Sequence, residues 1–104
     1  MEKIIPLKAK FLMDENPQAV ILDVRSFEEY MADGHLKGAM LIPLDRLAER
    51  AGEDLPDRDV MIFVYCRNGA RSSEAARLLD SMGYKCVYDI GGLVKWPFDI
   101  ESQQ

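Results

Sequence analysis

The stretch "YCRNGARSSEA", residues 65–75, places Cys66 at the start of a segment in which Arg67 and Arg71 lie on either side of Gly69. A thiol reacts as its thiolate, and nearby positive charge favours that form. Arginine can also hold an oxyanion through two parallel hydrogen bonds. An isolated cysteine is usually a small buried apolar residue. The flanking charges and the glycine favour instead a nucleophilic Cys66.

The elements that must position this segment alternate between strands and helices. Short apolar runs rich in β-branched residues predict strands at 19–24, 39–42, 60–65 and 86–90. Helical spacing of apolar residues predicts helices at 7–13, 26–32, 44–50 and 72–83. Ser26 as N-cap and Glu29 three residues later predict a capping box at the start of the second of these helices. This alternation predicts an α/β domain whose sheet is mostly parallel.

The predicted sheet places Cys66 where sites usually form, just beyond the carboxyl end of a strand. Cys66 is expected to be the first residue after the strand at 60–65, and Ser72 or Ser73 is expected to cap the next helix. A loop of this kind can direct several backbone N–H groups into one small hollow, aided by the helix dipole. Gly69 supplies the conformational freedom for the tight turn. We therefore expect the hollow to favour the thiolate of Cys66.

Composition narrows the class of protein. With 104 residues, 48% of them hydrophobic, the chain is expected to form one domain over 1–104. The net charge of −5 argues against nucleic acid and anionic membrane as partners. No signal-peptide pattern or membrane-length apolar run is present, so we expect a cytoplasmic protein.

The cysteine and histidine content excludes two kinds of site. Cys66 and Cys86 do not make a disulfide framework, and with His35 as the single histidine there are too few soft ligands for structural zinc. No metal or cofactor is expected, and a reducing compartment fits this content. Cys86 lies within the apolar run "CVYDI" and is expected to belong to the core.

The segment "CRNGAR" resembles the C-R-x-G-x-[RT] active-site loop of rhodanese-type sulfurtransferases. "AVILDVRSFEEY", "GHLKGAMLIPL" and "DIGGLVKW" are similar to further segments of that family, in the same order along the chain. Two departures lie away from the loop: Lys37 stands where the family usually has proline, and Tyr30 is one residue further from His35 than is common. The resemblance implies a rhodanese-like domain, a mostly parallel central sheet flanked by helices on both faces.

The resemblance also implies a reaction. Cys66 would attack the outer sulfur of a donor such as thiosulfate, release sulfite, and pass the sulfur from its persulfide to cyanide or a thiol. An arginine directly after the cysteine resembles thiosulfate enzymes, whereas mercaptopyruvate enzymes usually have glycine there. Thioredoxin or a desulfurase is a candidate protein partner. The donor would be bound by the remaining residues of the loop: Arg67, Asn68, Gly69, Ala70 and Arg71.

Two alternatives keep the same loop but change the function. Phosphatases related to this fold use Cys-x₅-Arg, whereas here only four residues separate Cys66 from Arg71. The shorter loop favours a sulfur atom over a tetrahedral phosphate. The other alternative is a non-catalytic persulfide carrier or regulatory module, which needs the same loop as the enzyme.

Four further polar or aromatic residues have both a structural and a functional interpretation. Asp23 and Arg25 follow a buried strand, where a salt bridge or a helix cap is favoured over a place at the pocket rim. His35 is interpreted as a hydrogen-bonded turn residue rather than a base, since transfer from a thiolate needs none. Trp96 is interpreted as packing over the edge of the core, with substrate stacking as the alternative.

Overall fold

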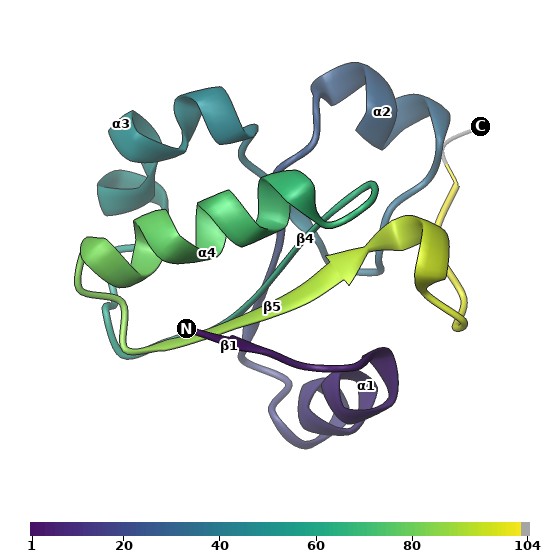
Figure 1. Cartoon of the computed structure of the whole chain (residues 1–104), viewed down its shortest axis with the longest axis horizontal. Helices are drawn as coiled ribbons and strands as arrows, with labels where there is room; N and C mark the ends of the chain where they lie inside the picture. The colour runs from purple at the N-terminus through teal and green to yellow at the C-terminus, as the bar shows by residue number, and fades with distance from the viewer. Residues whose placement is uncertain (103–104) are drawn as a thin grey trace.

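Residues 1–102, which the computed structural model describes, contain five strands joined in one parallel sheet (Figure 1). The order across the sheet is β1-β5-β4-β2-β3, and every neighbouring pair is parallel. The predicted parallel sheet is therefore confirmed, and the short β1 is an addition that the sequence did not predict. The strands are β1 (Glu2–Lys3), β2 (Val20–Asp23), β3 (Met40–Leu41), β4 (Met61–Cys66) and β5 (Cys86–Gly92).

Helices cover both faces of this sheet, as predicted. Helix α1 (Pro6–Glu15) lies on one face, and α3 (Leu44–Asp54) and α4 (Ala70–Ser81) lie on the other (Figure 1). The short α2 (Phe27–Ala32) follows the carboxyl end of β2, and a 3₁₀ turn, η1 (Leu93–Lys95), follows β5. None of the helices described within residues 1–102 has the length and apolar content needed to cross a bilayer.

The position of β4 in the middle of the sheet explains why its sequence is apolar without a break. Ile62, Val64 and Cys66 point to the core shared with α3 and α4. Phe63 and Tyr65 point to the core on the α1 side. Because successive side chains of a strand face opposite sides, a strand covered on both faces requires apolar residues at every position.

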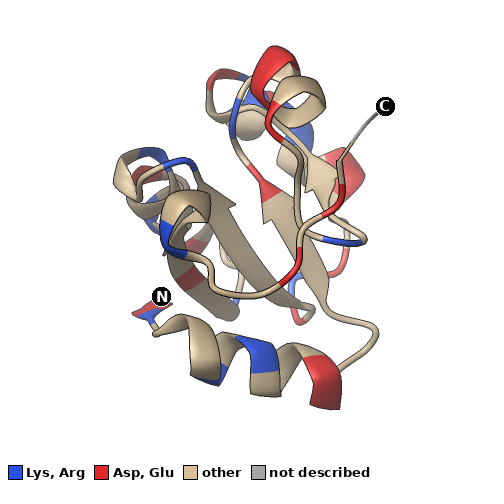
Figure 2. Ribbon diagram, turned by 90° about the vertical axis from the view of Figure 1, so that its right-hand side faces the viewer, with Lys and Arg blue, Asp and Glu red and all other residues tan. Residues whose placement is uncertain are grey.

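Charged residues are spread over the surface in mixed sign. Figure 2 shows acidic and basic positions interspersed along the ribbon. Several form ion pairs within one helix turn, among them Lys10–Asp14, Arg46–Glu49 and Arg50–Asp54. Exposed pairs of this kind contribute little to stability, typically below about 1 kcal/mol.

Both boundaries of the reactive loop differ from the prediction. Cys66 is the last residue of β4 and is fully buried, not the first residue beyond the strand. Helix α4 begins at Ala70 with Gly69 in the capping position at φ 103°, so neither Ser72 nor Ser73 is its N-cap. A glycine adopts this left-handed conformation without the penalty that a side chain brings. With Gly69 as the cap, α4 begins before Ser72, earlier than a serine cap would place it. The predicted capping box of α2 is confirmed, since Ser26 and Glu29 exchange hydrogen bonds.

A buried ion pair between Asp23 and Arg25 lies at the carboxyl end of β2, and a hydrogen bond from Tyr65 links it to β4. The Arg25 guanidinium donates to both carboxylate oxygens of Asp23, at 2.7 Å for the shortest contact, and to the Gly34 carbonyl at 2.6 Å. The Tyr65 hydroxyl donates to Asp23 at 2.7 Å and accepts from the Leu36 N–H at 3.0 Å. Burial, with the neighbouring Asp23, raises the pKa of Tyr65, so it stays a neutral donor. The salt bridge expected between Asp23 and Arg25 is therefore present.

Replacing Asp23 by asparagine should destabilise the fold strongly. Both partners are at most 1% exposed, so the substitution leaves a buried positive charge on Arg25 without its counter-charge. We expect urea unfolding to show a loss of about 3 kcal/mol or more. The matched control is Asp14→Asn in the exposed Lys10–Asp14 pair, which should cost less than about 0.5 kcal/mol. Equal losses in the two variants would contradict this account of the pair.

The two cysteines lie at opposite ends of neighbouring strands. Cys66 pairs with Gly92 at the carboxyl ends of β4 and β5, whereas Cys86 pairs with Met61 at the amino ends. Five residue steps along a strand separate the two positions by roughly 16 Å. Cys86 is half-buried at the start of β5, so its predicted place in the core is only partly correct.

Candidate active site

Backbone N–H groups converge on the sulfur of Cys66. The N–H of Gly69 lies 3.0 Å from Sγ, and the N–H of Ser72, in the first turn of α4, lies 3.3 Å from it. Both donors, together with the positive end of the helix dipole, stabilise negative charge on the sulfur. The convergence of loop N–H groups on the sulfur that was expected from the sequence is therefore present, at the end of β4.

The loop between Cys66 and α4 is held by its own side chains. The Asn68 side-chain oxygen accepts a hydrogen bond from the Ala70 N–H at 3.3 Å. The Ser72 hydroxyl contacts the Gly69 carbonyl at 3.1 Å and the Gly91 carbonyl at 3.4 Å. Ser72 thus connects the loop to β5 through its hydroxyl while its N–H faces the sulfur.

The end of β5 supports the loop from the other side. A bulge in the pairing of β4 with β5 sets Val64 opposite Asp89 but Tyr65 opposite Gly91, which advances the glycines by one position. The Val94 N–H, just beyond β5, donates to the Arg67 carbonyl at 3.2 Å. The backbones of the loop and of β5 therefore run in direct contact.

Gly92 is the residue that permits this contact. A Cβ at this position would lie 2.5 Å from the Asn68 Cα and would collide with the Arg67 carbonyl oxygen. The backbone of Gly92 is ordinary, at φ −104°, so its role is to leave space rather than to relieve strain. A side chain there must push the loop away from β5.

Accordingly, Gly92→Ala should displace the N–H donors from Cys66. We expect the sulfur transfer that the family resemblance implies to fall by about 10- to 50-fold, since small misplacements of reacting groups are costly. The control is Gly52→Ala within α3, where the nearest heavy atom to the new Cβ is 3.9 Å away and where activity should not change. An active Gly92→Ala protein with unchanged transfer kinetics would show that the loop is not positioned by this contact.

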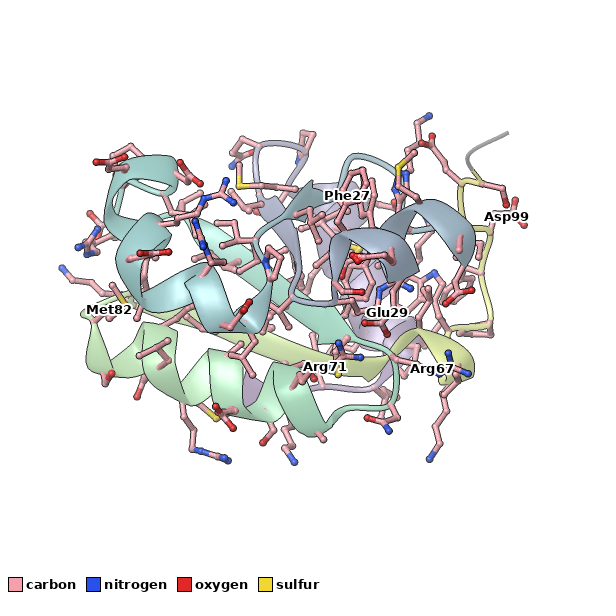
Figure 3. All side chains as sticks on the ribbon, turned by 90° about the horizontal axis from the view of Figure 1, so that it is seen from above. Phe27, Glu29, Arg67, Arg71, Met82 and Asp99 are labelled. Atoms are coloured by element: carbon pink, nitrogen blue, oxygen red, sulfur yellow. The ribbon has the colours of Figure 1, made fainter. Side chains whose placement is uncertain are left out.

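The two arginines of the loop have different surroundings. Arg67 is 60% exposed and lies 3.7 Å from the Asp33 carboxylate. Arg71 instead forms a two-point ion pair with Glu29 of α2, at 2.6 and 2.8 Å, and Figure 3 shows these two side chains pointing toward one another. The hydrogen bond from Arg71 is the main cause that lowers the pKa of Glu29 to about 2, so Glu29 is ionised at any working pH.

His35 and Trp96 occupy packed positions. The His35 ring is buried, stacks on Tyr30 at 3.9 Å between centroids, and has Nδ1 2.9 Å from the Leu36 carbonyl. Trp96 packs against the core on the α1 side and meets Phe98 edge to face at 5.2 Å. These contacts favour the structural interpretation of both residues.

Comparison with known proteins is consistent with this arrangement. The model of the rhodanese-like domain family matches residues 7–97. The chain belongs to the rhodanese-like family. It is thus a member of the rhodanese family of sulfurtransferases, and its five-stranded parallel sheet is the fold of rhodanese structures.

Three relatives illustrate the match. The thiosulfate sulfurtransferase PspE of Escherichia coli (strain K12) is 40% identical over 72 residues, 69% of this chain and 68% of PspE. The putative sulfur carrier protein YrkF of Bacillus subtilis (strain 168) is 38% identical over 85 residues, 81% of this chain and 44% of YrkF. The solved structure of a rhodanese with anions from E. coli is 34% identical, has a TM-score of 0.74, and the match covers 81% of this chain and 98% of that one.

Three residues of this rhodanese-like site were not assigned a place in it from the sequence. The sequence indicates Glu29 only as a capping residue on a solvated face, which its ion pair with Arg71 corrects. It indicates Ser72 only as a candidate cap and Gly92 only as part of "DIGGLVKW". The glycine pair was the one usable signal, because adjacent glycines at a strand end indicate close backbone approach. The Glu29–Arg71 pair joins positions 42 apart, and no local pattern indicates it.

Proposed function

We propose that this chain transfers a sulfane sulfur from thiosulfate, or a donor like it, to a thiophilic acceptor through a persulfide on Cys66. The observation that carries the proposal is the pair of N–H groups directed at Sγ from Gly69 and Ser72. Such donors stabilise a sulfur anion before and after transfer. The relative named as a thiosulfate sulfurtransferase supports the choice of donor.

In the first half-reaction, the Cys66 thiolate attacks the outer sulfur of thiosulfate. A bond forms between Sγ and that sulfur, the bond to the sulfonate breaks, and sulfite leaves with its electron pair. The product is the persulfide anion Cys66–S–S⁻, and the charge is conserved. We propose that the loop from Arg67 to Arg71 encloses the transferred sulfur, and that Arg67 attracts the anionic donor because its charge is the more exposed.

In the second half-reaction, the acceptor attacks the outer sulfur of the persulfide. When the acceptor is cyanide, the product is thiocyanate; when it is a thiolate, the product is a new persulfide. In both cases the Cys66 thiolate is regenerated as the leaving group. Two half-reactions that share one covalent intermediate give ping-pong kinetics. Neither step requires a base, a metal or a cofactor.

The direct test is a mass spectrum of the protein after treatment with thiosulfate. The proposal expects one added sulfur atom on the peptide that contains Cys66, removed again by cyanide. Sulfur on Cys86, or no added sulfur, would overturn it.

A persulfide carrier is the second candidate, favoured by the likeness to the relative named as a putative sulfur carrier. Both candidates form the persulfide, so the mass spectrum does not separate them. Steady-state turnover with thiosulfate and cyanide does, because a carrier loads once and exchanges slowly with small molecules, whereas an enzyme cycles.

A further inference from the structure

The arginines nearest to Cys66 all face carboxylates. Arg25 is paired with Asp23 inside the protein, and Arg67 has Asp33 at 3.7 Å. Arg71 presents both terminal nitrogens to the two oxygens of Glu29. The positive site suggested by the sequence is therefore largely compensated in the folded chain.

The pair formed by Arg71 is joined through the backbone to an N–H donor of the site. Arg71 directly precedes Ser72, whose N–H donates to the Cys66 sulfur. The forked grip that Arg71 might have offered to a donor is already occupied, so an anion must compete with Glu29 for the same two nitrogens.

Glu29 is fixed in place from two directions. Its Oε1 also accepts the Ser26 N–H at 3.0 Å, while its own N–H donates to the Ser26 hydroxyl at 3.1 Å. The carboxylate is 22% exposed and the Arg71 side chain 35%, so water screens the pair less than an open surface pair. The charge of Glu29 therefore stays beside the site when a donor approaches.

The cavity next to this pair carries more negative charge. It has a volume of about 410 Å³, and its lining includes Arg25 and Arg71 together with Asp45 and Glu74. Because both arginines are paired with carboxylates, an anion in this cavity meets acidic residues without free positive charge to offset them. This disfavours a doubly charged donor most.

We propose that Glu29 is a specificity-determining residue that lowers the affinity for dianionic sulfur donors by neutralising Arg71. The proposal rests on the proposed function, because it concerns donors of the same Cys66 site. The favoured donors are then those whose sulfane sulfur belongs to a singly charged or neutral group, such as the persulfide of a thiol. Thiosulfate is then a donor that the site accepts with reduced affinity.

The test compares Glu29→Gln with Glu28→Gln. Glutamine can keep the capping box, so the first substitution removes the charge without removing the cap. Glu28 is an exposed residue in the same helical turn, so its substitution changes the net charge of the chain equally. Thermal unfolding of both proteins checks that each is folded before kinetics are measured.

Two donors of different charge provide the first readout: thiosulfate, a dianion that releases sulfite, and methanethiosulfonate, a monoanion that releases methanesulfinate. In Glu29→Gln the KM for thiosulfate should fall on the order of tenfold, and that for methanethiosulfonate by about threefold. The kcat with either donor should stay within about twofold, and Glu28→Gln should resemble wild type. A higher KM for thiosulfate in Glu29→Gln, or the same change for both donors, would overturn the proposal.

Alkylation of Cys66 gives a second readout that needs no turnover. The ratio of the rate with iodoacetate, an anion, to the rate with neutral iodoacetamide should rise by about threefold in Glu29→Gln and stay constant in Glu28→Gln. If the proteins form no persulfide but the ratio changes as expected, the sulfur-transfer proposal fails while the charge effect of Glu29 stands. An unchanged ratio in Glu29→Gln would overturn the inference whatever the thiosulfate assay shows.

Discussion

Replacing Cys66 by serine should abolish persulfide formation and lower turnover on the order of 10⁴-fold or more, as loss of a covalent nucleophile does elsewhere. A serine hydroxyl is far less acidic than a thiol and must lose its proton to react. The hydrogen-bond partners of the Cys66 sulfur are backbone N–H groups, which donate protons and cannot accept one. The site therefore has the means to stabilise an anion but not to create one from an alcohol.

The matched control for this substitution is Cys86→Ser. Cys86 lies at the amino end of β5, away from the loop, so the variant should form the persulfide and keep the activity of wild type. Because Cys66 is fully buried, circular dichroism and thermal unfolding must show that the Cys66→Ser protein is folded. Sulfur transfer by folded Cys66→Ser, or its loss in Cys86→Ser, would refute the assignment of the nucleophile.

Inserting one glycine after Asn68 should lower sulfur transfer on the order of 10²-fold or more. The insertion raises the number of residues between Cys66 and Arg71 from four to the five of the related phosphatases. The enlarged ring moves the N–H donors away from the sulfur, since hydrogen bonds of this kind require about 3 Å. The same enlargement should admit weak hydrolysis of an activated aryl phosphate, which the wild-type protein should not hydrolyse.

A glycine inserted between Pro56 and Asp57 is the control for the loop insertion. This segment precedes β4 and lies at the opposite end of that strand from Cys66. The rate of sulfur transfer should therefore change by less than about threefold. Ready hydrolysis of aryl phosphates by wild type, or unchanged thiosulfate turnover after the insertion at Asn68, would show that loop length does not select between sulfur and phosphate.

The sequence was sufficient for the parts of the fold that depend on local patterns. The apolar run at 60–65 indicated a strand buried on both faces, and β4 is that strand with its end one residue later. The capping box from Ser26 to Glu29 indicated the start of α2 correctly because both partners lie within one turn. The same holds for the loop, since a cysteine, a glycine and two arginines within six residues form a local signal.

The features that could not be predicted depend on contacts between distant segments. The bulge that advances Gly91 and Gly92 toward the loop arises from pairing of β4 with β5, and each strand alone carries no sign of it. The start of α4 at Ala70 follows from the left-handed Gly69, whereas a serine cap was the better guess from propensity alone. The ion pair between Arg71 and Glu29 requires α2 and α4 to meet, so no local pattern showed that Arg71 has this partner.

The separation of the two thiols determines what can happen to a sulfur atom once it is bound. With Cys86 roughly 16 Å away along the strands, no second cysteine of this chain can attack a persulfide or a sulfenic acid on Cys66. The persulfide proposed on Cys66 would therefore be discharged by a thiol other than Cys86, at a rate set by the concentration of that thiol. Where such thiols are scarce, the proposed loaded state would persist, and peroxide would oxidise an unloaded Cys66 thiolate past the sulfenic acid to irreversible sulfinic and sulfonic forms.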